Sequence, residues 1–160
     1  MLSFIKKSIF DINAQVYVNP VNCQGISGAG LALEFKNRYP DMFDCYEQSC
    51  KNQVLKPGGV CIWTNPDSNG SYPSYVWCVA TMYNPGYRAT NIAIKRCLTS
   101  ISELLNIYTE VNSIAMPAIG CGIGRFKFDN LREMIITMYN EYCVNYREVD
   151  IYVCEPKLYV

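Results

Sequence analysis

Residues 19–30 read Asn19-Pro20-Val21-Asn22-Cys23-Gln24-Gly25-Ile26-Ser27-Gly28-Ala29-Gly30, and residues 117–126 read Pro117-Ala118-Ile119-Gly120-Cys121-Gly122-Ile123-Gly124-Arg125-Phe126. Each of these glycine-rich stretches lies between a strand-like apolar run and a helix-like segment. Glycines at alternate positions let backbone N–H groups turn toward one point, and the N-terminus of a following helix adds partial positive charge there. Together the two loops predict a pyrophosphate held between them.

The apolar pattern around these loops predicts an α/β chain. Strands are expected at residues 2–5, 15–18, 60–63, 75–80, 114–116 and 151–154, and helices at 31–39, 42–52, 94–108 and 128–142. Strands that alternate with helices indicate three α/β/α layers around a mixed, mainly parallel central sheet, with ligands bound at the carboxyl ends of the strands. Both glycine-rich loops lie at such ends.

Length and charge limit the classes of protein that fit. A chain of 160 residues is the size of one domain, so a single domain over residues 1–160 is expected. Lys plus Arg and Asp plus Glu number 14 each, so the chain lacks the overall basic charge of a dedicated nucleic-acid binder. The order of charged and apolar residues at the N-terminus does not fit a secretory signal, and the apolar run at 75–80 is too short to span a bilayer. We therefore expect a cytoplasmic monomer with no membrane partner.

Cysteine and histidine usage exclude several kinds of site. The chain has nine cysteines, no Cys-x-x-Cys pair and no histidine. This pattern predicts no zinc site, no other metal and no cofactor, and it excludes Ser-His and Cys-His nucleophiles. We expect buried, reduced thiols at the cysteines that fall in apolar runs, which are Cys23, Cys61, Cys78, Cys97, Cys143 and Cys154.

Known phosphate-binding motifs do not match the first loop. Gly25 and Gly30 have the spacing of a Walker motif, but Leu31-Ala32 stands where Lys-Ser/Thr is required, and the third glycine of a dinucleotide fingerprint is missing. For either loop alone, a purely structural role of the glycines in a tight turn is as good an interpretation as ligand binding. The amides of Asn19, Asn22 and Gln24 at the end of a strand favour instead a ligand with several hydroxyls, such as a sugar.

These residues resemble a known family. Nearly the whole chain looks like a macro domain. The resemblance is carried by Val18–Gly25, Gly28–Phe35, the pair Tyr39-Pro40 and the second loop at 117–124. The chain is most similar to the branch that holds ADP-ribose 1''-phosphate phosphatases and the hydrolases that remove ADP-ribose from acidic side chains or DNA bases. The resemblance implies ADP-ribose or a derivative as ligand, and an ADP-ribosylated protein or nucleic acid as partner.

The resemblance also implies a set of contacts. Asn22 is expected beside the distal ribose, the backbone of Gly28–Gly30 beside that ribose and the adjacent phosphate, and the backbone of Gly120–Phe126 around the pyrophosphate, with Ile123 closing over the ligand. The full set of expected ligand-binding residues is Asn19, Asn22, Gln24, Gly28, Ala29, Gly30, Thr81, Pro117, Ile119, Gly120, Cys121, Gly122, Ile123, Gly124, Arg125 and Phe126.

The chain departs from the family at three positions. Similar proteins carry Gly-Asp-Ile where this chain has Lys7-Ser8-Ile9, so the carboxylate that accepts from the adenine amino group is missing. Asp11 either replaces it or is a solvated turn residue. Met82 stands where glycohydrolases have a lysine after the residue that matches Thr81, and Gly124 stands where one type has an aspartate. A lysine-dependent mechanism is not expected.

The remaining route to hydrolysis is a positioned water. We expect Asn22, Gln24 or a ligand phosphate to hold it toward the distal C1'' or its phosphate, so orientation and preorganised donors supply the effect. Glu34 and Asp129 are the nearest candidate bases, at helical positions that more often face solvent. Cys121 either has a thiol pKa lowered by the helix N-terminus or is a small residue that fits under the loop, and the second interpretation is favoured.

Two classes of function stay open. One is an enzyme that hydrolyses ADP-ribose 1''-phosphate or an ADP-ribosyl adduct, which the compact single-domain form favours. The other is a module that reads or sequesters ADP-ribose without turnover, which Met82 favours. The segment Tyr83–Arg88 gates the site, grips a group beyond the distal ribose, or is a solvated connector. A reader of single-stranded RNA or nucleotides that uses exposed tyrosines is a third class, disfavoured by the neutral charge.

Overall fold

The computed structural model describes residues 1–143 and 148–157. Its elements are β1 (Leu2–Ile5), the 3-10 turn η1 (Ile9–Asp11), β2 (Val16–Asn22), α1 (Gly30–Arg38), α2 (Pro40–Lys51), β3 (Val60–Thr64), β4 (Tyr75–Met82), α3 (Asn91–Ile107), β5 (Ser113–Met116), α4 (Phe128–Met138), the π-helical turn η2 (Tyr139–Cys143) and β6 (Asp150–Cys154). The predicted succession of helices and strands is confirmed.

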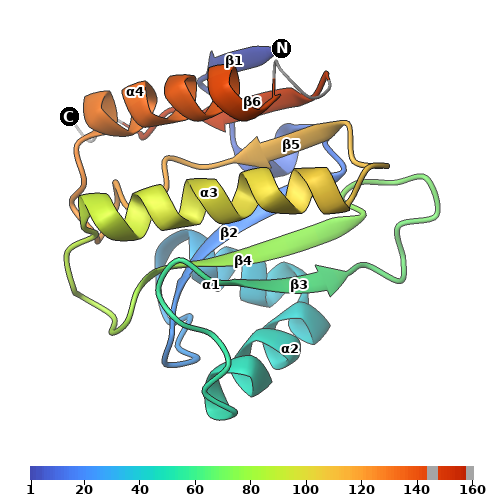
Figure 1. Cartoon of the computed structure of the whole chain (residues 1–160). Coiled ribbons are helices and arrows are strands. Elements are labelled where there is room, and N and C mark those ends of the chain that lie inside the picture. The colour runs from blue at the N-terminus through green and yellow to red at the C-terminus, as the bar shows by residue number, and fades with distance from the viewer. Residues whose placement is uncertain (144–147, 158–160) are drawn as a thin grey trace.

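One six-stranded sheet forms the centre, in the order β1-β6-β5-β2-β4-β3 (Figure 1). All neighbouring strands run parallel except the pair β3 and β4, which is antiparallel. The prediction of a mixed, mainly parallel sheet is therefore confirmed.

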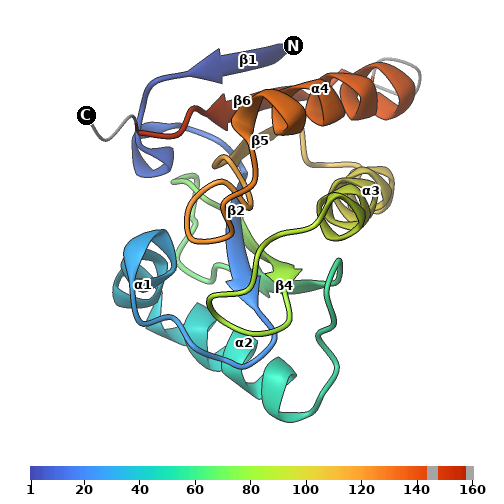
Figure 2. The same ribbon diagram turned by 90° about the vertical axis from the view of Figure 1, so that its left-hand side faces the viewer.

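Helices cover both faces of this sheet. Figures 1 and 2 show α1 and α2 on one face and α3 and α4 on the other. Alternate residues of a strand point to opposite faces, so Trp77 and Val79 of β4 pack in the core under α3 and α4. Their neighbours Cys78 and Ala80 pack under α1 and α2. The three-layer α/β/α architecture follows from these two cores.

The observed elements differ from the predicted ones at their ends. Strand β2 continues to Asn22, because Asn19 and Pro20 still pair with Cys78 and Val79 of β4. Helix α2 begins at Pro40, since proline fits the first helical position, where no N–H is needed. The turn η1 was not predicted, and its N-cap Ser8 accepts a 3.3 Å hydrogen bond from the backbone N–H of Phe10. Helix α4 ends at Met138 and continues as the π-helical turn η2.

The predicted burial of the cysteines is confirmed for Cys23, Cys61, Cys78, Cys97 and Cys154. The side chain of Cys143 lies outside the part of the chain that the structure describes. None of the helices within residues 1–143 and 148–157 combines the length and hydropathy that crossing a membrane requires.

Candidate ligand-binding site

A cavity of about 910 Å³ lies over the carboxyl ends of the parallel strands. Five neighbouring strands run in the same direction, so the segments that follow them lie side by side in the order β1, β6, β5, β2, β4 at one edge of the sheet. Figure 2 looks onto this edge. The cavity is lined by Lys7, Ser8, Ile9, Pro20, Val21, Asn22, Ile26, Ser27, Gly28, Ala29, Gly30, Leu31, Ala32, Glu34, Thr81, Met82, Pro85, Gly86, Pro117, Ala118, Gly120, Cys121, Gly122, Ile123, Gly124, Cys154, Glu155, Pro156 and Lys157. Its volume suits a small organic ligand.

Asn22 holds the first loop, residues 23–29, in place. Its Oδ1 accepts hydrogen bonds from the backbone N–H of Gln24 at 2.9 Å and of Ile26 at 3.4 Å, and its Nδ2 donates to the Ile26 carbonyl at 2.8 Å. From α2, the Tyr46 hydroxyl lies 2.7 Å from the Asn22 carbonyl oxygen and 3.0 Å from Oδ1. One Nδ2 hydrogen of Asn22 thus remains to be donated into the cavity.

The second loop, residues 117–127, is closed by its own backbone. Phe126 N–H donates to the Gly120 carbonyl at 2.8 Å, and Ala89 N–H, from the loop between β4 and α3, donates to the Gly124 carbonyl at 2.9 Å. A Cβ at Gly124 would lie 2.7 Å from the Gly120 oxygen, and Gly120 has φ +76° with 2.8 Å to Ile94 Cδ1. Both positions therefore require glycine.

Free backbone donors line the cavity from two sides. Within the described residues, the N–H groups of Gly122, Ile123 and Gly124 donate no hydrogen bond. Helix α1 begins at Gly30 with Ala29 as its N-cap and no side-chain cap, so within the described residues the N–H groups of Gly30, Leu31 and Ala32 also lack an acceptor. Such N–H groups and the positive end of a helix bind anions. The middle of the cavity is therefore suited to an anionic group.

Charged side chains lie at the β1 and β6 end of the cavity. Lys7 follows β1, Glu155 and Lys157 follow β6, and the Glu155 N–H donates to the Ile5 carbonyl at 2.9 Å. Glu34 of α1 also lines the cavity and is exposed. At the β4 end, the lining residues Thr81, Met82, Pro85 and Gly86 carry no charge.

Most of the residues predicted for the site line this cavity. They are Asn22, Gly28, Ala29, Gly30, Thr81, Pro117, Gly120, Cys121, Gly122, Ile123 and Gly124.

Five predicted residues, namely Asn19, Gln24, Ile119, Arg125 and Phe126, lie outside the lining. Asn19 is 1% exposed because β2 continues past it, and its Nδ2 lies 3.6 Å from Cys78 Sγ. Ile119 is part of the core under α3 and α4, and Phe126 packs against that core. Gln24 is exposed and donates to the Tyr83 carbonyl at 3.5 Å, and Arg125 is exposed. Direct ligand contact by these five stays a prediction, and the proposal below does not use it.

Sequence reasoning missed the end of the cavity formed by Lys7, Ile9 and residues 154–157. Their contribution depends on the pairing of β1 with β6, which joins the two ends of the chain and which no local pattern predicts. The one available signal was that residues 155–157 follow a predicted parallel strand. Asp11, the candidate replacement for the missing aspartate, is exposed and lies outside the lining, whereas Ser8 lines the cavity.

The candidate acids and bases also have defined places. Burial raises the pKa of the Cys121 thiol to about 11, so the interpretation in which the loop lowers this pKa is wrong. Asp129 is exposed on α4, outside the cavity lining, and Met82 lines it half-buried. Within residues 1–143 and 148–157, no group of three or more His, Cys, Asp or Glu side chains could hold a metal ion.

Known proteins provide an independent comparison. A family model described as Macro domain matches residues 18–135. The Mycobacterium tuberculosis protein named DNA ADP-ribosyl glycohydrolase is 26% identical over 143 residues, which cover 88% of this chain and 39% of that protein. The Meyerozyma guilliermondii protein named ADP-ribose 1''-phosphate phosphatase is 31% identical over 148 residues, which cover 76% of this chain and 85% of that protein.

A solved structure agrees with these relatives. Thermosipho africanus DarTG in complex with ADP-ribose aligns with a TM-score of 0.83 at 22% identity, over 95% of this chain and 41% of that one. The chain spans about two fifths of the length of the bacterial glycohydrolases that it matches. The resemblance read from the two glycine-rich loops is confirmed.

Proposed function

Because the chain belongs to the Macro domain family, we propose that its cavity binds ADP-ribose or a close derivative. The observation that carries this proposal is the set of free backbone N–H groups on both sides of the cavity, in the second loop and in the first turn of α1. A pyrophosphate brings two negative charges and several acceptor oxygens to such donors.

The cavity has room for a sugar on each side of the pyrophosphate. At the β4 end, the free Nδ2 hydrogen of Asn22 and the hydroxyl of Thr81 suit the hydroxyls of the distal ribose. At the β1 and β6 end, Ile9 and Pro156 give apolar surface for a base, and Ser8 and Glu155 give polar groups. The order of strands therefore matches a dinucleotide-like ligand laid along the edge of the sheet.

We further propose that the protein hydrolyses an ADP-ribosyl adduct or ADP-ribose 1''-phosphate. In the first case a water oxygen forms a bond to the distal C1'', the bond from C1'' to the leaving group breaks, and the proton of the water passes to the leaving group or to solvent. The preorganised donors around the distal ribose and the pyrophosphate would orient the reactants. The two relatives' names supply the substrate classes, an ADP-ribosylated DNA and the 1''-phosphate.

Binding without turnover is the second candidate, and one observation favours it. The side chains that line the β4 end of the cavity include no carboxylate or lysine, and Met82 occupies the place next to Thr81. Among the residues of the second loop that line the cavity, Cys121 alone has a titratable side chain, and burial raises its pKa to about 11. At neutral pH this thiol is protonated and is a poor base.

A paired experiment tests the proposals. Calorimetry should show saturable binding of ADP-ribose to the wild-type chain, and Asn22→Ala should weaken it. Incubation with ADP-ribose 1''-phosphate and with an ADP-ribosylated DNA oligonucleotide should release free ADP-ribose, and Asn22→Ala should slow that release. Binding with intact substrate at high protein concentration would select the non-catalytic module, and no binding at all would refute both.

A further inference from the structure

Two thiols from different elements meet where α2 lies against β3, the strand at one edge of the sheet (Figure 1). The Sγ atoms of Cys45 in α2 and Cys61 in β3 are 3.7 Å apart, and both cysteines are free. In a disulfide the two sulfur atoms are about 2.0 Å apart. The pair therefore lies close enough for a small rotation of the two side chains to join them covalently.

Both backbones are held in place independently of this contact. All five residues of β3 pair with β4, and the rings of Tyr39, just before α2, and Trp63 of β3 have their centres 5.8 Å apart. Tyr46, which follows Cys45 in α2, is fully buried, and its hydroxyl donates to a backbone carbonyl of β2 at 2.7 Å. The contact between Cys45 and Cys61 is thus built into the packing of α2 on the sheet.

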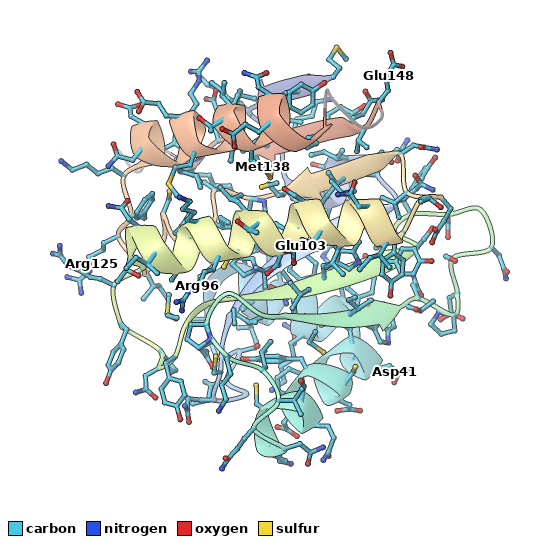
Figure 3. All side chains as sticks on the ribbon, viewed as in Figure 1. Asp41, Arg96, Glu103, Arg125, Met138 and Glu148 are labelled. Carbon is cyan, nitrogen blue, oxygen red and sulfur yellow. The ribbon has the colours of Figure 1, made fainter. Side chains whose placement is uncertain are left out.

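The two thiols differ in their access to solvent. Asp41, one helical turn before Cys45, is an exposed side chain of α2 (Figure 3), and Cys45 on the same side of the helix is half-buried. Cys61 is only 8% exposed. Burial raises the pKa of the Cys61 thiol to about 12, and the neighbouring Cys45 adds to this shift. A small molecule in solution therefore reaches Cys45 first, while Cys61 waits behind it as a protonated thiol.

We propose that Cys45 and Cys61 are a redox-active pair that a peroxide oxidises to a disulfide. The Cys45 sulfur, as a thiolate, attacks one peroxide oxygen, so that an S–O bond forms, the O–O bond breaks, and the other oxygen leaves as water after taking up a proton. The Cys61 sulfur then gives up its proton and attacks the Cys45 sulfur. The S–S bond forms and the S–O bond breaks, and the hydroxide takes a proton to leave as a second water.

The electrons and atoms of this reaction balance. The two thiols together lose two electrons and two protons, and one molecule of hydrogen peroxide is reduced to two molecules of water. A dithiol such as dithiothreitol reverses the change by thiol–disulfide exchange.

Cys78 is the alternative partner for Cys61, since it lies directly opposite on β4. Its sulfur is engaged elsewhere, because Cys78 Sγ donates to Met42 Sδ at 3.2 Å and accepts from Asn19 Nδ2 at 3.6 Å. Cys78 is also 0% exposed. The geometry therefore favours Cys45, which contacts Cys61 and can be reached from solvent.

The bond would tie α2 to the edge of the sheet. It closes a loop over residues 45–61, which restricts the unfolded chain and should raise the melting temperature by roughly 5 °C or more. The helix that it fixes carries Tyr46, which holds the first loop in place. Neither cysteine lines the ligand cavity.

Peptide mapping of the oxidised protein tests the proposal. The reduced wild-type chain is treated with a small excess of hydrogen peroxide, its remaining thiols are blocked with N-ethylmaleimide, and its digest is analysed by mass spectrometry without reduction. We expect one linked peptide pair that contains Cys45 and Cys61, a chain lighter by two hydrogen atoms, and a higher melting temperature. Dithiothreitol should reverse all three changes.

Two variants control the experiment. Cys45→Ser should lose both the link and the rise in melting temperature. Cys121→Ser is the matched control, because Cys121 is also half-buried but forms no hydrogen bond to another thiol in the described part of the chain. It should keep the link between Cys45 and Cys61 and the rise in melting temperature.

The other outcomes overturn the proposal. These are a link from Cys61 to Cys78, a link between two chains, oxidation of Cys45 to a sulfinic acid without a link, and thiols that stay unchanged. A Cys45–Cys61 link that leaves the melting temperature unchanged or lowers it overturns the tie between α2 and β3. The experiment uses no ADP-ribose, so its result does not depend on the proposed function.

Discussion

Asn22 both holds the backbone of the first loop in place and lines the ligand cavity. The residue is only 9% exposed. Its side chain forms hydrogen bonds to the first loop and to Tyr46 of α2, while one Nδ2 hydrogen stays free. Most of its hydrogen bonds hold the loop in place, and one donor remains for a ligand. Its loss should therefore affect both stability and affinity.

Asn22→Ala should lower the free energy of unfolding by about 2 kcal/mol, because buried donors lose their acceptor. It should also weaken ADP-ribose binding more than tenfold. Gln24→Ala is the matched control, since Gln24 is the exposed neighbouring amide outside the cavity lining, and it should change neither quantity. Urea denaturation and calorimetry measure the two effects. Equal effects of the two substitutions would contradict the role given to Asn22.

Gly124→Ala and Gly122→Ala should differ sharply. The added methyl at Gly124 would meet the Gly120 oxygen at 2.7 Å, whereas at Gly122 no heavy atom lies within 4 Å. The first substitution should cost about 1–3 kcal/mol of stability, and the second should be close to neutral. Thermal or urea unfolding of the two variants checks this, and a destabilised Gly122→Ala would show that the second loop is built differently.

Asn19 illustrates what sequence reasoning could not resolve at single residues. Asn-Pro is typical of a turn, so the loop was expected to begin at Asn19. The strand continues because β4 pairs with it through Asn22, and the alternation of β2 then turns Asn19 toward Met42 and Cys78. Pairing with a distant strand decided the side chain's direction, and no local pattern encodes that pairing.

At the scale of elements, α2 braces the first loop across the face of the sheet. Tyr46 is fully buried, and its hydroxyl bonds Asn22, while Cys50 Sγ lies 3.9 Å from the same carbonyl oxygen. The position of the loop therefore depends on a helix that does not line the cavity.

Tyr46→Phe should loosen the first loop without removing any group from the cavity. We expect a loss of about 1–2 kcal/mol in the free energy of unfolding and a severalfold weaker affinity for ADP-ribose. The control is Tyr75→Phe, which also removes a hydrogen bond, that of the Tyr75 hydroxyl to Glu110 at 2.7 Å, but at the opposite, amino end of β4. Affinity that stays at the wild-type value in Tyr46→Phe would contradict the bracing role.

Elements with strong local patterns were predictable, and their neighbours in the sheet were not. The stripe of α3 at Ile94, Leu98, Ile101 and Leu105 was readable from spacing and is buried as expected. The two loops followed from their glycines. The β1 and β6 end of the cavity was missed, because the pairing of the first and last strands appears only in the assembled sheet.

At the scale of the whole molecule, buried thiols predict how stability depends on pH. Burial raises the pKa of Cys23, Cys121 and Cys154 to about 11 and that of Cys61 and Cys97 to about 12, from an ordinary value of 9.0. The folded state thus favours the protonated thiols. Their contribution is fully present below pH 9.0, where the unfolded chain is also protonated, and is lost as pH rises toward 11 to 12.

The free energy of unfolding in reducing buffer should accordingly fall between about pH 9 and 11. Urea denaturation at intervals of pH measures it, and Cys121→Ser, which removes one half-buried thiol, should make the fall less steep. Stability that is constant or rises over this range would contradict the burial of these thiols.

Backbone N–H groups of two loops are placed to hold a pyrophosphate between them. The most direct test is a titration of the ¹⁵N-labelled protein with ADP-ribose, followed by amide chemical shifts. We expect saturable shifts, with one dissociation constant, for Gly122, Ile123, Gly124 and the first turn of α1, and none for Gly70 in the loop between β3 and β4. Shifts that spare the two glycine-rich loops, or no shifts at all, would contradict it.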